Sequence, residues 1–254
     1  MPEEEGRSMP IRVLAVSDQV DPRIYSASIK ERMSDVQIVF GCGDLPASYL
    51  EFLADALDRP IYFVFGNHLE EATRQSGGKL YQPMGCIDVG GKVIHDTWTD
   101  LIIAGIPGSP KYGEGEPLQF TEWQIRWMIW KMTPRLWWNR LRHGRALDVL
   151  ITHAPPRDLG DRDDLPHRGF VAMRRMLERF HPRYQLHGHV HLYDRSEPWA
   201  HEYEGTTIIN VYPYRVLDLD LASRTARDPV TSDPTTGANA QQPGPSRPEE
   251  HAHG

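Results

Sequence analysis

Five short apolar segments of this sequence each end just before a polar residue that can bind a metal ion. Short runs of this kind, rich in β-branched residues, are typical of buried strands. The segments are 11–16, 36–40, 61–65, 147–151 and 184–186, and they lead into Asp18, Asp44, Asn67, His153 and a run that contains His189 and His191. Because the carboxyl ends of parallel strands gather at one edge of an α/β sheet, these side chains can converge there.

The segments between these strands have helical patterns. Helices are expected at 26–33, 48–57 and 168–180, and further strands at 101–106, 206–211 and 215–221. Strands that alternate with helices predict a layered α/β domain. The close spacing of the last two strands indicates an antiparallel or mixed part of a sheet.

Composition divides the chain into three parts. We expect a flexible leader at 1–10, one domain at 11–222 and a disordered tail at 223–254. The tail has no aromatic residue and is rich in Pro, Thr, Ala and Gly, so it cannot bury enough apolar surface to fold. A Trp-rich helical insertion is expected at 119–145.

The charge and the two cysteines restrict the class of protein. The formal net charge is −7, which does not attract a nucleic-acid backbone, so no stable nucleic-acid partner is expected. Cys42 and Cys86 are too few for a disulfide framework. The start is acidic, unlike a signal peptide, and no apolar run reaches the ~18 residues of a membrane span. We therefore expect a cytoplasmic protein without membrane contact.

The candidate ligands combine carboxylate, carboxamide and imidazole groups. They are Asp18, Asp44, Asn67, His153, His189 and His191. This mixture suits Mn, Fe or Zn better than Ca. Two such ions ~3.5–4 Å apart polarise a phosphoryl group and generate a nucleophile, so one or two divalent ions and phosphate ester chemistry are expected.

The order of these motifs resembles the calcineurin-like metallophosphoesterase superfamily. The family pattern is D-x-H, G-D, G-N-H, a histidine after a strand, and G-H-x-H. The corresponding residues are Asp18-Gln19-Val20, Gly43-Asp44, Gly66-Asn67-His68, Thr152-His153 and Gly188-His189-Val190-His191. Four of the five blocks are intact. The resemblance implies a four-layer αββα sandwich with mixed sheets and a metal pair at the rim where the strands end.

The resemblance also implies a role for each residue of the motifs. Asp44 would bridge the two ions. Asn67, His153 and His189 would complete one metal position, and Asp18 and His191 would serve the other. His68 would help to protonate the leaving alkoxide or to stabilise the phosphoryl transition state, which is general acid chemistry.

Val20 departs from the family pattern, which has a second imidazole at this point. The position of Asp18 and His191 is therefore one ligand short. Three outcomes are open: the second ion is weakened, a nearby loop supplies a replacement ligand, with Gln19 and Asp21 as candidates, or the centre holds a single ion. A fourth interpretation is that Val20 only fills an apolar gap beside an unused position.

A charge-rich loop follows His153 and runs from Arg157 to Arg168. Such loops are usually solvated surface, and that interpretation stays open. The alternative is that His167 and Arg168 contact the substrate phosphate, with Asp163 orienting one of them.

The segment 119–145 has a helical pattern with an aromatic stripe. Thr121 and Gln124 form a capping box, and Pro134 is expected to end or kink the helix. Three tryptophans share one helical face: Trp123, Trp127 and Trp130. We expect this face to pack on the domain or on a second copy in a homo-oligomer. A cap over the metal site and peripheral membrane contact are the alternatives.

These patterns favour a metal-dependent phosphoesterase that acts on a small phosphorylated substrate. The expected reaction is hydrolysis of a phosphodiester or a phosphomonoester by attack of metal-bound hydroxide, with the diester slightly favoured. One alternative is a binding scaffold with the same fold and weakened catalysis, which Val20 would explain. Another is a metal-dependent hydrolase of a different ester. His68 argues against the scaffold, because a protein that only binds has little use for a reacting histidine.

Overall fold

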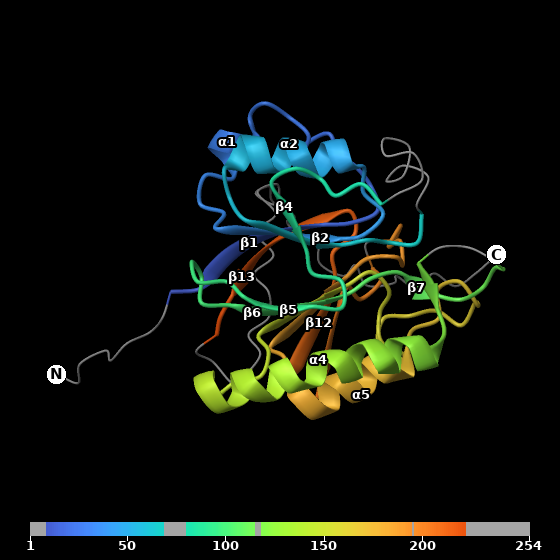
Figure 1. Ribbon diagram of the computed structural model, residues 1–254. Helices are drawn as coiled ribbons and strands as arrows, with labels where there is room; N and C mark the ends of the chain where they lie inside the picture. Colours follow the sequence, from blue (N-terminus) through green and yellow to red (C-terminus); the bar gives the residue numbers. More distant parts are fainter. Residues whose placement is uncertain (1–8, 69–79, 115–117, 195, 222–254) are drawn as a thin grey trace, which may run out of the picture.

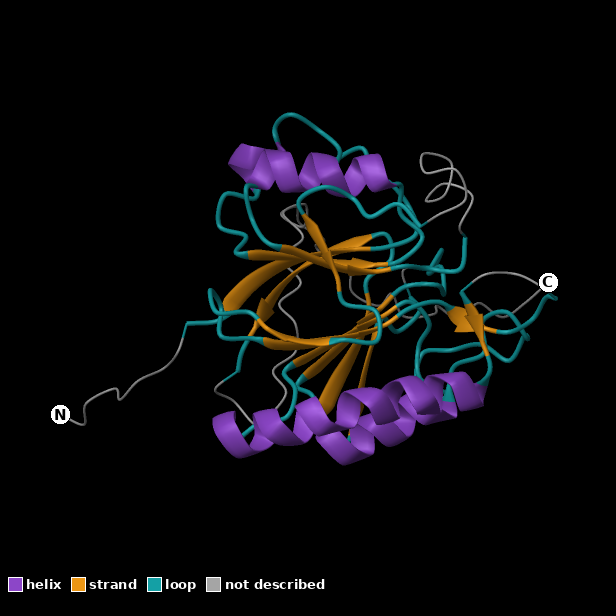
Figure 2. Cartoon of the chain, in the orientation of Figure 1, coloured by secondary structure: helices purple, strands orange, loops and turns teal. Residues whose placement is uncertain are grey.

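The polypeptide folds into four layers, in which two β-sheets lie between two pairs of helices (Figures 1 and 2). The computed structural model describes residues 9–68, 80–114, 118–194 and 196–221. Helices α1 and α2 cover the outer face of one sheet, and α4 and α5 cover the outer face of the other. This arrangement is the αββα sandwich that the order of the motifs predicts.

The elements follow the alternation of segments in the sequence. Their bounds are β1 (Ile11–Val16), α1 (Ile29–Arg32), β2 (Ile38–Cys42), α2 (Ala47–Leu57), β3 (Ile61–Val64), β4 (Cys86–Asp88), β5 (Val93–His95), β6 (Ile102–Ile106), β7 (Ser109–Pro110), β8 (Gln119–Phe120), α4 (Glu122–His143), β9 (Val149–Thr152), α5 (Val171–Phe180), β10 (Tyr184–His187), β11 (Ala200–Tyr203), β12 (Thr206–Asn210) and β13 (Tyr214–Leu219). Every expected strand is present close to its predicted bounds. The helix expected at 26–33 is a single turn, and the helix expected at 168–180 starts later because Phe170 forms a β-bridge with Pro156.

Both large sheets are mixed. The first has the order β13-β1-β2-β3-β4, the second has the order β11-β12-β10-β9-β6-β5, and β7 and β8 form a separate pair. Strands β1, β2 and β3 run parallel in the first sheet, as do β6, β9, β10 and β12 in the second. Their carboxyl ends therefore share one edge of each sheet, and the loops that carry the motifs start there.

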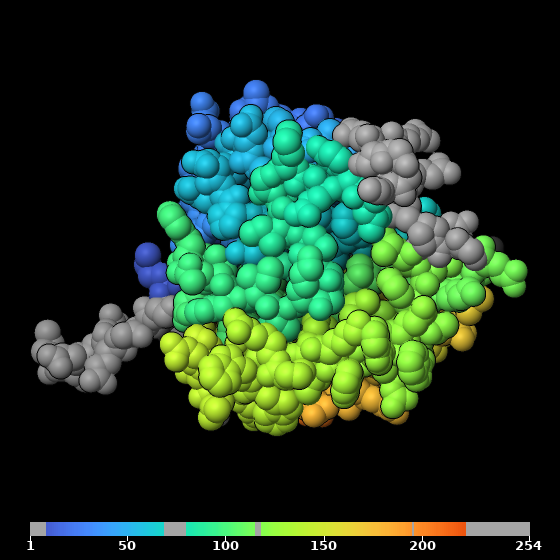
Figure 3. All heavy atoms as spheres, in the orientation of Figure 1, coloured from blue at the N-terminus to red at the C-terminus, as the bar shows by residue number. Residues whose placement is uncertain are grey.

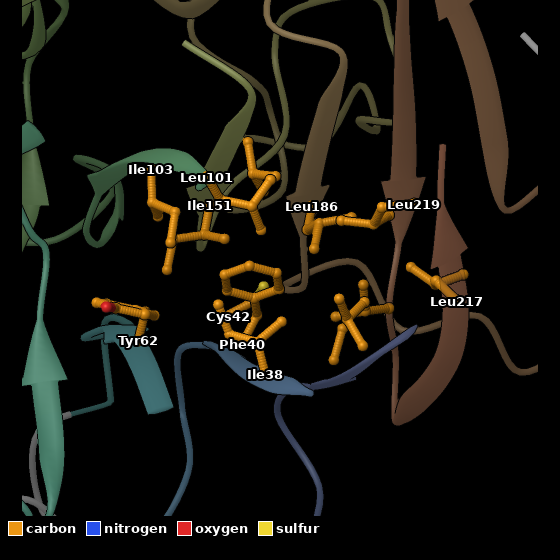
Figure 4. Packing of buried hydrophobic residues seen from close by; sticks show 14 of the residues in the cluster. Ile38, Phe40, Cys42, Tyr62, Leu101, Ile103, Ile151, Leu186, Leu217 and Leu219 are labelled. Atoms are coloured by element: carbon orange, nitrogen blue, oxygen red, sulfur yellow. The ribbon is translucent and has the colours of Figure 1, made fainter. Parts of the chain in front are cut away.

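Three apolar cores hold the four layers together. The central core lies between the sheets, where Phe40 and Cys42 face Ile103, Ile151 and Leu186 (Figure 4). A second core fills the space between the first sheet and helices α1 and α2, and a third lies between the second sheet and helices α4 and α5. Because the central strands of both sheets are buried on both faces, they appear in the sequence as continuous apolar runs.

Helix α4 continues through Pro134, so of the two outcomes expected for this residue, ending or kinking the helix, the first is wrong. The capping box is confirmed, because the Thr121 side chain accepts from the Gln124 N–H and the Gln124 side chain accepts from the Thr121 N–H. A proline inside a helix costs about 3 kcal/mol. The buried residues Met132 and Leu136 on either side offset this cost, since burying each side chain stabilises the fold by about 1.5–3 kcal/mol.

The tryptophan face of α4 does not pack on the domain, so this part of the expectation is wrong, whereas packing on a second copy stays a prediction. Trp123, Trp127 and Trp130 are exposed, whereas Ile125 and Leu136 are the residues that α4 buries against the second sheet. Both sets recur at helical spacing, so periodicity alone does not tell the buried apolar face from the exposed one.

Parts of the predicted domain organisation lie outside the described residues. These are residues 1–8 of the expected leader and the whole of the expected tail at 223–254. Within the described part of the chain, no helix combines the length and the apolar character needed to cross a membrane.

Candidate metal centre

Residues from four strand ends meet at the carboxyl rim of the two sheets. Asp44 follows β2, Asn67 follows β3, His153 follows β9 and His189 follows β10. One ligand atom from each of Asp44, His153 and His189 lies within 4.8 Å of the others. The topology thus brings together four of the candidate ligands that the sequence predicts.

His153 lies at the centre of this group and is fully buried. Its Nε2 atom is 3.1 Å from Oδ2 of Asp44 and 3.0 Å from Oδ1 of Asn67. Its Nδ1 is 2.8 Å from the carbonyl oxygen of Cys42, to which it donates a hydrogen bond. This bond fixes the orientation of the ring and leaves Nε2 as the atom that can bind an ion.

His189 is oriented in a similar way from the opposite side. Its Nε2 is 2.7 Å from the carbonyl oxygen of Pro166, so this nitrogen donates there and Nδ1 is left free. The rings of His153 and His189 lie 4.8 Å apart between their centroids. Two imidazoles so close together, with a carboxylate oxygen within 4.8 Å of a ring nitrogen of each, form a candidate site for a cation.

The geometry of this group fits a divalent transition metal. Ligand atoms about 2.0–2.2 Å from one ion lie roughly 3 Å from each other, and the separations of 3.0 and 3.1 Å around Nε2 of His153 match this value. The donors are two imidazoles, one carboxylate and one carboxamide oxygen, which suit Zn, Mn or Fe. The residues present therefore fit the group that the motifs predict.

The charges of the group also favour a cation. Burial disfavours the charged imidazole, but the Asp44 carboxylate beside it raises the pKa of His153 to about 9. Burial opposes the ionisation of Asp44, yet His153 and then His68 hold the pKa of Asp44 well below its usual range. Burial and the neighbouring His153 lower the pKa of His189 to about 3. The carboxylate thus stays charged, and a bound proton on His153 occupies the place that an ion would take.

The glycines of the motifs make room for these side chains. A Cβ atom at Gly66 would lie 1.9 Å from Oδ1 of Asp44, and one at Gly43 would lie 2.5 Å from Nδ1 of His153. Asp44 itself has a φ of 52° and His189 a φ of 66°, in the left-handed region that such residues rarely adopt. Strained backbone of this kind gathers at functional sites, where the surrounding structure maintains it.

Asp18 and His191 form a second, smaller group beside the first. Nε2 of His191 is 3.5 Å from Oδ1 of Asp18. The Asp18 carboxylate also accepts hydrogen bonds from the Ser17 hydroxyl and from the His189 N–H at 3.0 Å. The His191 ring stacks on Tyr212, with 4.4 Å between the ring centroids. The fold therefore brings together the two candidate ligands of the second position.

Val20 and its neighbours add no ligand to this second position. Val20 is half-buried and packs against the core between the first sheet and helices α1 and α2. The carboxylate of Asp21 forms an ion pair with Arg23 at 2.8 Å. Gln19 accepts a hydrogen bond from the Tyr212 hydroxyl through Oε1, at 2.7 Å. Both replacement candidates are thus engaged elsewhere, and of the four interpretations the replacement by Asp21 or Gln19 loses its support.

His68 lies at the mouth of the first group. Its backbone N–H donates to Oδ1 of Asp44 at 2.9 Å, while Nε2 of its ring is 3.9 Å from Oδ2 of Asp44. The side chain is 76% exposed, so it can exchange protons with a ligand in solvent. Beside it is a hollow whose lining includes Leu45, Phe65, Tyr81 and Pro83.

The charge-rich loop brings one of its two predicted contact residues to the group. His167 lies beside His189, with 5.1 Å between the ring centroids, and Asp164 orients it through a 2.5 Å contact to Nδ1. It is thus Asp164, and not Asp163, that orients His167; the Asp163 carboxylate lies 3.7 Å from Arg157. Arg168 instead donates to the backbone carbonyl of Asp163 at 3.1 Å.

Three residues near the group were not predicted from the sequence. Nδ2 of Asn67 donates to the hydroxyl of Tyr112 at 3.1 Å, and this tyrosine lies in a glycine-rich loop that carries no recognisable pattern. Ser17 and Tyr212 contact Asp18 and His191, respectively. Tyr212 follows β12, a strand parallel to β10. It could therefore have been predicted from the rule that site residues follow parallel strands.

Comparisons with known proteins agree with this fold. A family model described as calcineurin-like phosphoesterase matches residues 29–193. The crystal structure of TT1561 of Thermus thermophilus is 14% identical, with a TM-score of 0.51 over 80% of this chain and 89% of that chain. Another crystal structure, also 14% identical, has a TM-score of 0.56 over 83% of this chain and 95% of the other. At such identities these structures show the fold alone. No curated protein matches the sequence.

Proposed function

Because the chain belongs to the calcineurin-like phosphoesterase family, we propose that it hydrolyses a phosphodiester of a small molecule with the help of divalent metal. The family is one of metal-dependent phosphoric ester hydrolases. The observation that carries the proposal is the convergence of Asp44, Asn67 and His189 around Nε2 of His153. A carboxylate, a carboxamide and two imidazoles that lie this close together are the donor types that a divalent transition metal takes in proteins.

The proposed metal ligands fall into the two groups described above. Asp44, Asn67, His153 and His189 would hold one ion, and Asp18 and His191 would hold a second with fewer protein ligands. Bound divalent ions polarise phosphoryl oxygens and lower the pKa of water towards neutral pH. The protein's part is to fix the donors, and the hydrogen bonds from His153 to Cys42 and from His189 to Pro166 do this.

We assign the proton transfer to His68. Its exposed ring, 3.9 Å from Oδ2 of Asp44, lies next to the place where a phosphoryl group held by the ions would be. A histidine can give a proton to the leaving alkoxide at neutral pH, because its ordinary pKa lies close to this range. His167, held by Asp164, is the nearest described histidine on the other side of His189 and would contact the phosphoryl oxygens.

The hollow beside His68 supports a diester as the substrate. A diester carries two organic substituents, whereas a monoester carries one. The side chains of Leu45, Phe65, Tyr81 and Pro83 form a small apolar and aromatic surface beside His68, against which part of the second substituent can pack. We propose a nucleotide or a similar small diester as the substrate.

The test is a direct comparison of two chromogenic substrates. The metal-loaded protein is given bis(p-nitrophenyl) phosphate and p-nitrophenyl phosphate, and kcat/KM is measured for each with Mn²⁺ and with Zn²⁺. A higher kcat/KM for the diester supports the proposal, and a higher value for the monoester contradicts it. Bound metal without turnover of either substrate would leave the binding scaffold as the better account.

A further inference from the structure

Helix α4 carries five of the seven tryptophans of the chain, and all five are exposed. They are Trp123, Trp127, Trp130, Trp137 and Trp138, with exposed fractions between 45% and 69%. Leu141 on the same helix is also exposed. Large aromatic side chains are usually well buried, and a continuous exposed group of them marks an interaction surface.

These residues occupy one side of the helix. An α-helix turns by about 100° per residue, which places the five tryptophans and Leu141 within an arc of about 100°. The buried residues Ile125, Met132 and Leu136 lie on the opposite side and pack on the second sheet. Helix α4 therefore has two apolar faces: one holds it to the protein, and the other, here called the Trp face, is exposed. The helix itself lies at the surface of the molecule (Figure 3).

Basic residues border the Trp face along both edges. By the same helical geometry, Arg126 and Arg140 lie on one border, and the other border carries Lys131, Arg135 and Arg142. The ammonium group of Lys131 lies 3.3 Å from the centroid of the Trp127 ring. The borders thus place positive charge beside the aromatic rings.

The single acidic residue of α4 does not neutralise this face. The Glu122 carboxylate accepts hydrogen bonds from the N–H groups of Val171 and Ala172, at 2.7 and 3.0 Å. It therefore caps the start of α5 instead of pairing with the basic borders. The Trp face is positive in a chain whose formal net charge is −7.

We propose that the Trp face binds flat on the surface of an anionic lipid bilayer. Tryptophan side chains favour the level of the lipid headgroups, and arginine and lysine beside them attract anionic lipids. A helix with an apolar stripe between basic borders lies in the plane of the interface and does not cross it. The rest of the chain carries a net negative charge, so electrostatic attraction favours the orientation in which this face meets the bilayer.

The charge pattern favours a bilayer over a second copy of the chain. Two Trp faces in contact would bring the basic borders of both copies close together, and like charges in a desolvated interface are unfavourable. An anionic bilayer supplies the opposite charge along both borders. The sequence favours packing of this face on the domain or on a second copy, and the proposal takes up the alternative of peripheral membrane contact instead.

The test is sedimentation of the full chain with vesicles. Vesicles of phosphatidylcholine with phosphatidylglycerol should bind the protein, vesicles of phosphatidylcholine alone should bind it much more weakly, and added salt should weaken the binding. Tryptophan emission should shift to shorter wavelength on binding. Absence of binding to the anionic vesicles would overturn the proposal.

Exposed positions allow matched variants that leave the fold intact. Trp123→Ser with Trp130→Ser should weaken vesicle binding by at least about tenfold, because both rings leave the interface. The control is Trp98→Ser, since Trp98 is 73% exposed outside α4 and its loss should change nothing. Circular dichroism checks that the fold is retained. An equal loss of binding in the control would overturn the proposal.

Charge variants test the borders of the Trp face separately. Arg135→Gln with Arg142→Gln should weaken binding to anionic vesicles by about tenfold or more, while Lys30→Gln with Lys111→Gln should leave it unchanged. Two further results would contradict the proposal. One is a protein that does not bind vesicles but forms a dimer, which is lost in the tryptophan variants. The other is a protein that does not bind vesicles but binds a single-stranded oligonucleotide.

Discussion

The two proposed metal positions differ in how completely the fold builds them. The first gathers Asp44, Asn67, His153 and His189, most of them buried and each held by a further hydrogen bond or ion pair. The second has only Asp18 and His191, and the His191 side chain is 38% exposed. The family match covers residues 29–193 and so begins after Asp18.

This difference shows which of the candidate ligands are positioned by the topology of the sheets. The first position takes its ligands from the ends of four strands, whose parallel arrangement fixes where they meet. The second takes Asp18 from a short loop after β1, where Val20 stands in place of the imidazole of the family pattern and packs on the core between the first sheet and helices α1 and α2. Its affinity for an ion therefore depends on single residues.

Loss of Asp44 should have the largest effect, because it belongs to the first position and is proposed to bridge both. Asp44→Ala should abolish metal-dependent phosphoesterase turnover and lower the metal content. Asp44→Asn keeps the shape and tests the charge alone. The exposed Asp163→Ala is the control and should keep full activity. Normal turnover in both Asp44 variants would overturn the assignment of the site.

His68 should affect the reaction without affecting either metal position. His68→Ala should keep its metal content while kcat falls by roughly 10²–10⁴ for substrates with poor leaving groups, the usual range of general acid catalysis. A nitrophenol leaving group needs less protonation and should suffer a smaller loss. Metal analysis and kcat for an alkyl and a nitrophenyl ester check this. Equal losses for both esters would indicate electrostatic stabilisation instead of proton transfer.

A ligand restored at Val20 should make the two positions more alike. Val20→His should raise the affinity for the second ion by ~10–100-fold, because an imidazole replaces water. Val20→Ala is the matched control, since it removes the same apolar side chain and adds no ligand. Calorimetric titration of the metal-free variants compares them. The same affinity in the histidine and alanine variants would show that residue 20 does not face the ion.

The pH should affect the first position in a defined direction. An ion at Nε2 of His153 must displace a proton, and the Asp44 carboxylate raises the pKa of His153 to about 9 in the metal-free protein. Below this pH a proton competes with the metal, so affinity should rise by about tenfold per pH unit and level off above it. Titrations in a pH series measure this slope. A flat profile between neutral pH and pH 9 would contradict the role of His153.

The sequence predicts the first position well for a physical reason. Buried parallel strands appear as apolar runs, and their carboxyl ends must meet. Asp44 and His153 could therefore be placed together although they lie far apart in the sequence. Cys42, two residues before Asp44, accepts a hydrogen bond from His153, which lies 111 positions later. The absence of an imidazole at position 20 can also be read from the sequence. The contact of Tyr112 with Asn67 cannot, because the position of a long glycine-rich loop depends on tertiary packing.

Helix α4 shows where the pattern of apolar residues is insufficient. Ile125 and Leu136, like Trp123 and Trp130, are separated by a whole number of helical turns, and only the packing on the second sheet decides which set is buried. The free-energy cost of a proline inside the helix at Pro134 is likewise smaller than the stabilisation from burying the helical residues on both sides of it. Local signals therefore predicted the start of this helix through its capping box, but not its length or its exposed face.

The number of ions that the unaltered protein binds tests the central claim most directly. Metal-free protein is titrated with Mn²⁺ or Zn²⁺, and the stoichiometry and both affinities are measured by calorimetry and metal analysis. The account predicts one tightly bound ion per chain, with a second bound weakly or not at all. Two tightly bound ions would contradict the claim that the positions are unequal and would point to a replacement ligand, with His167 the first residue to examine.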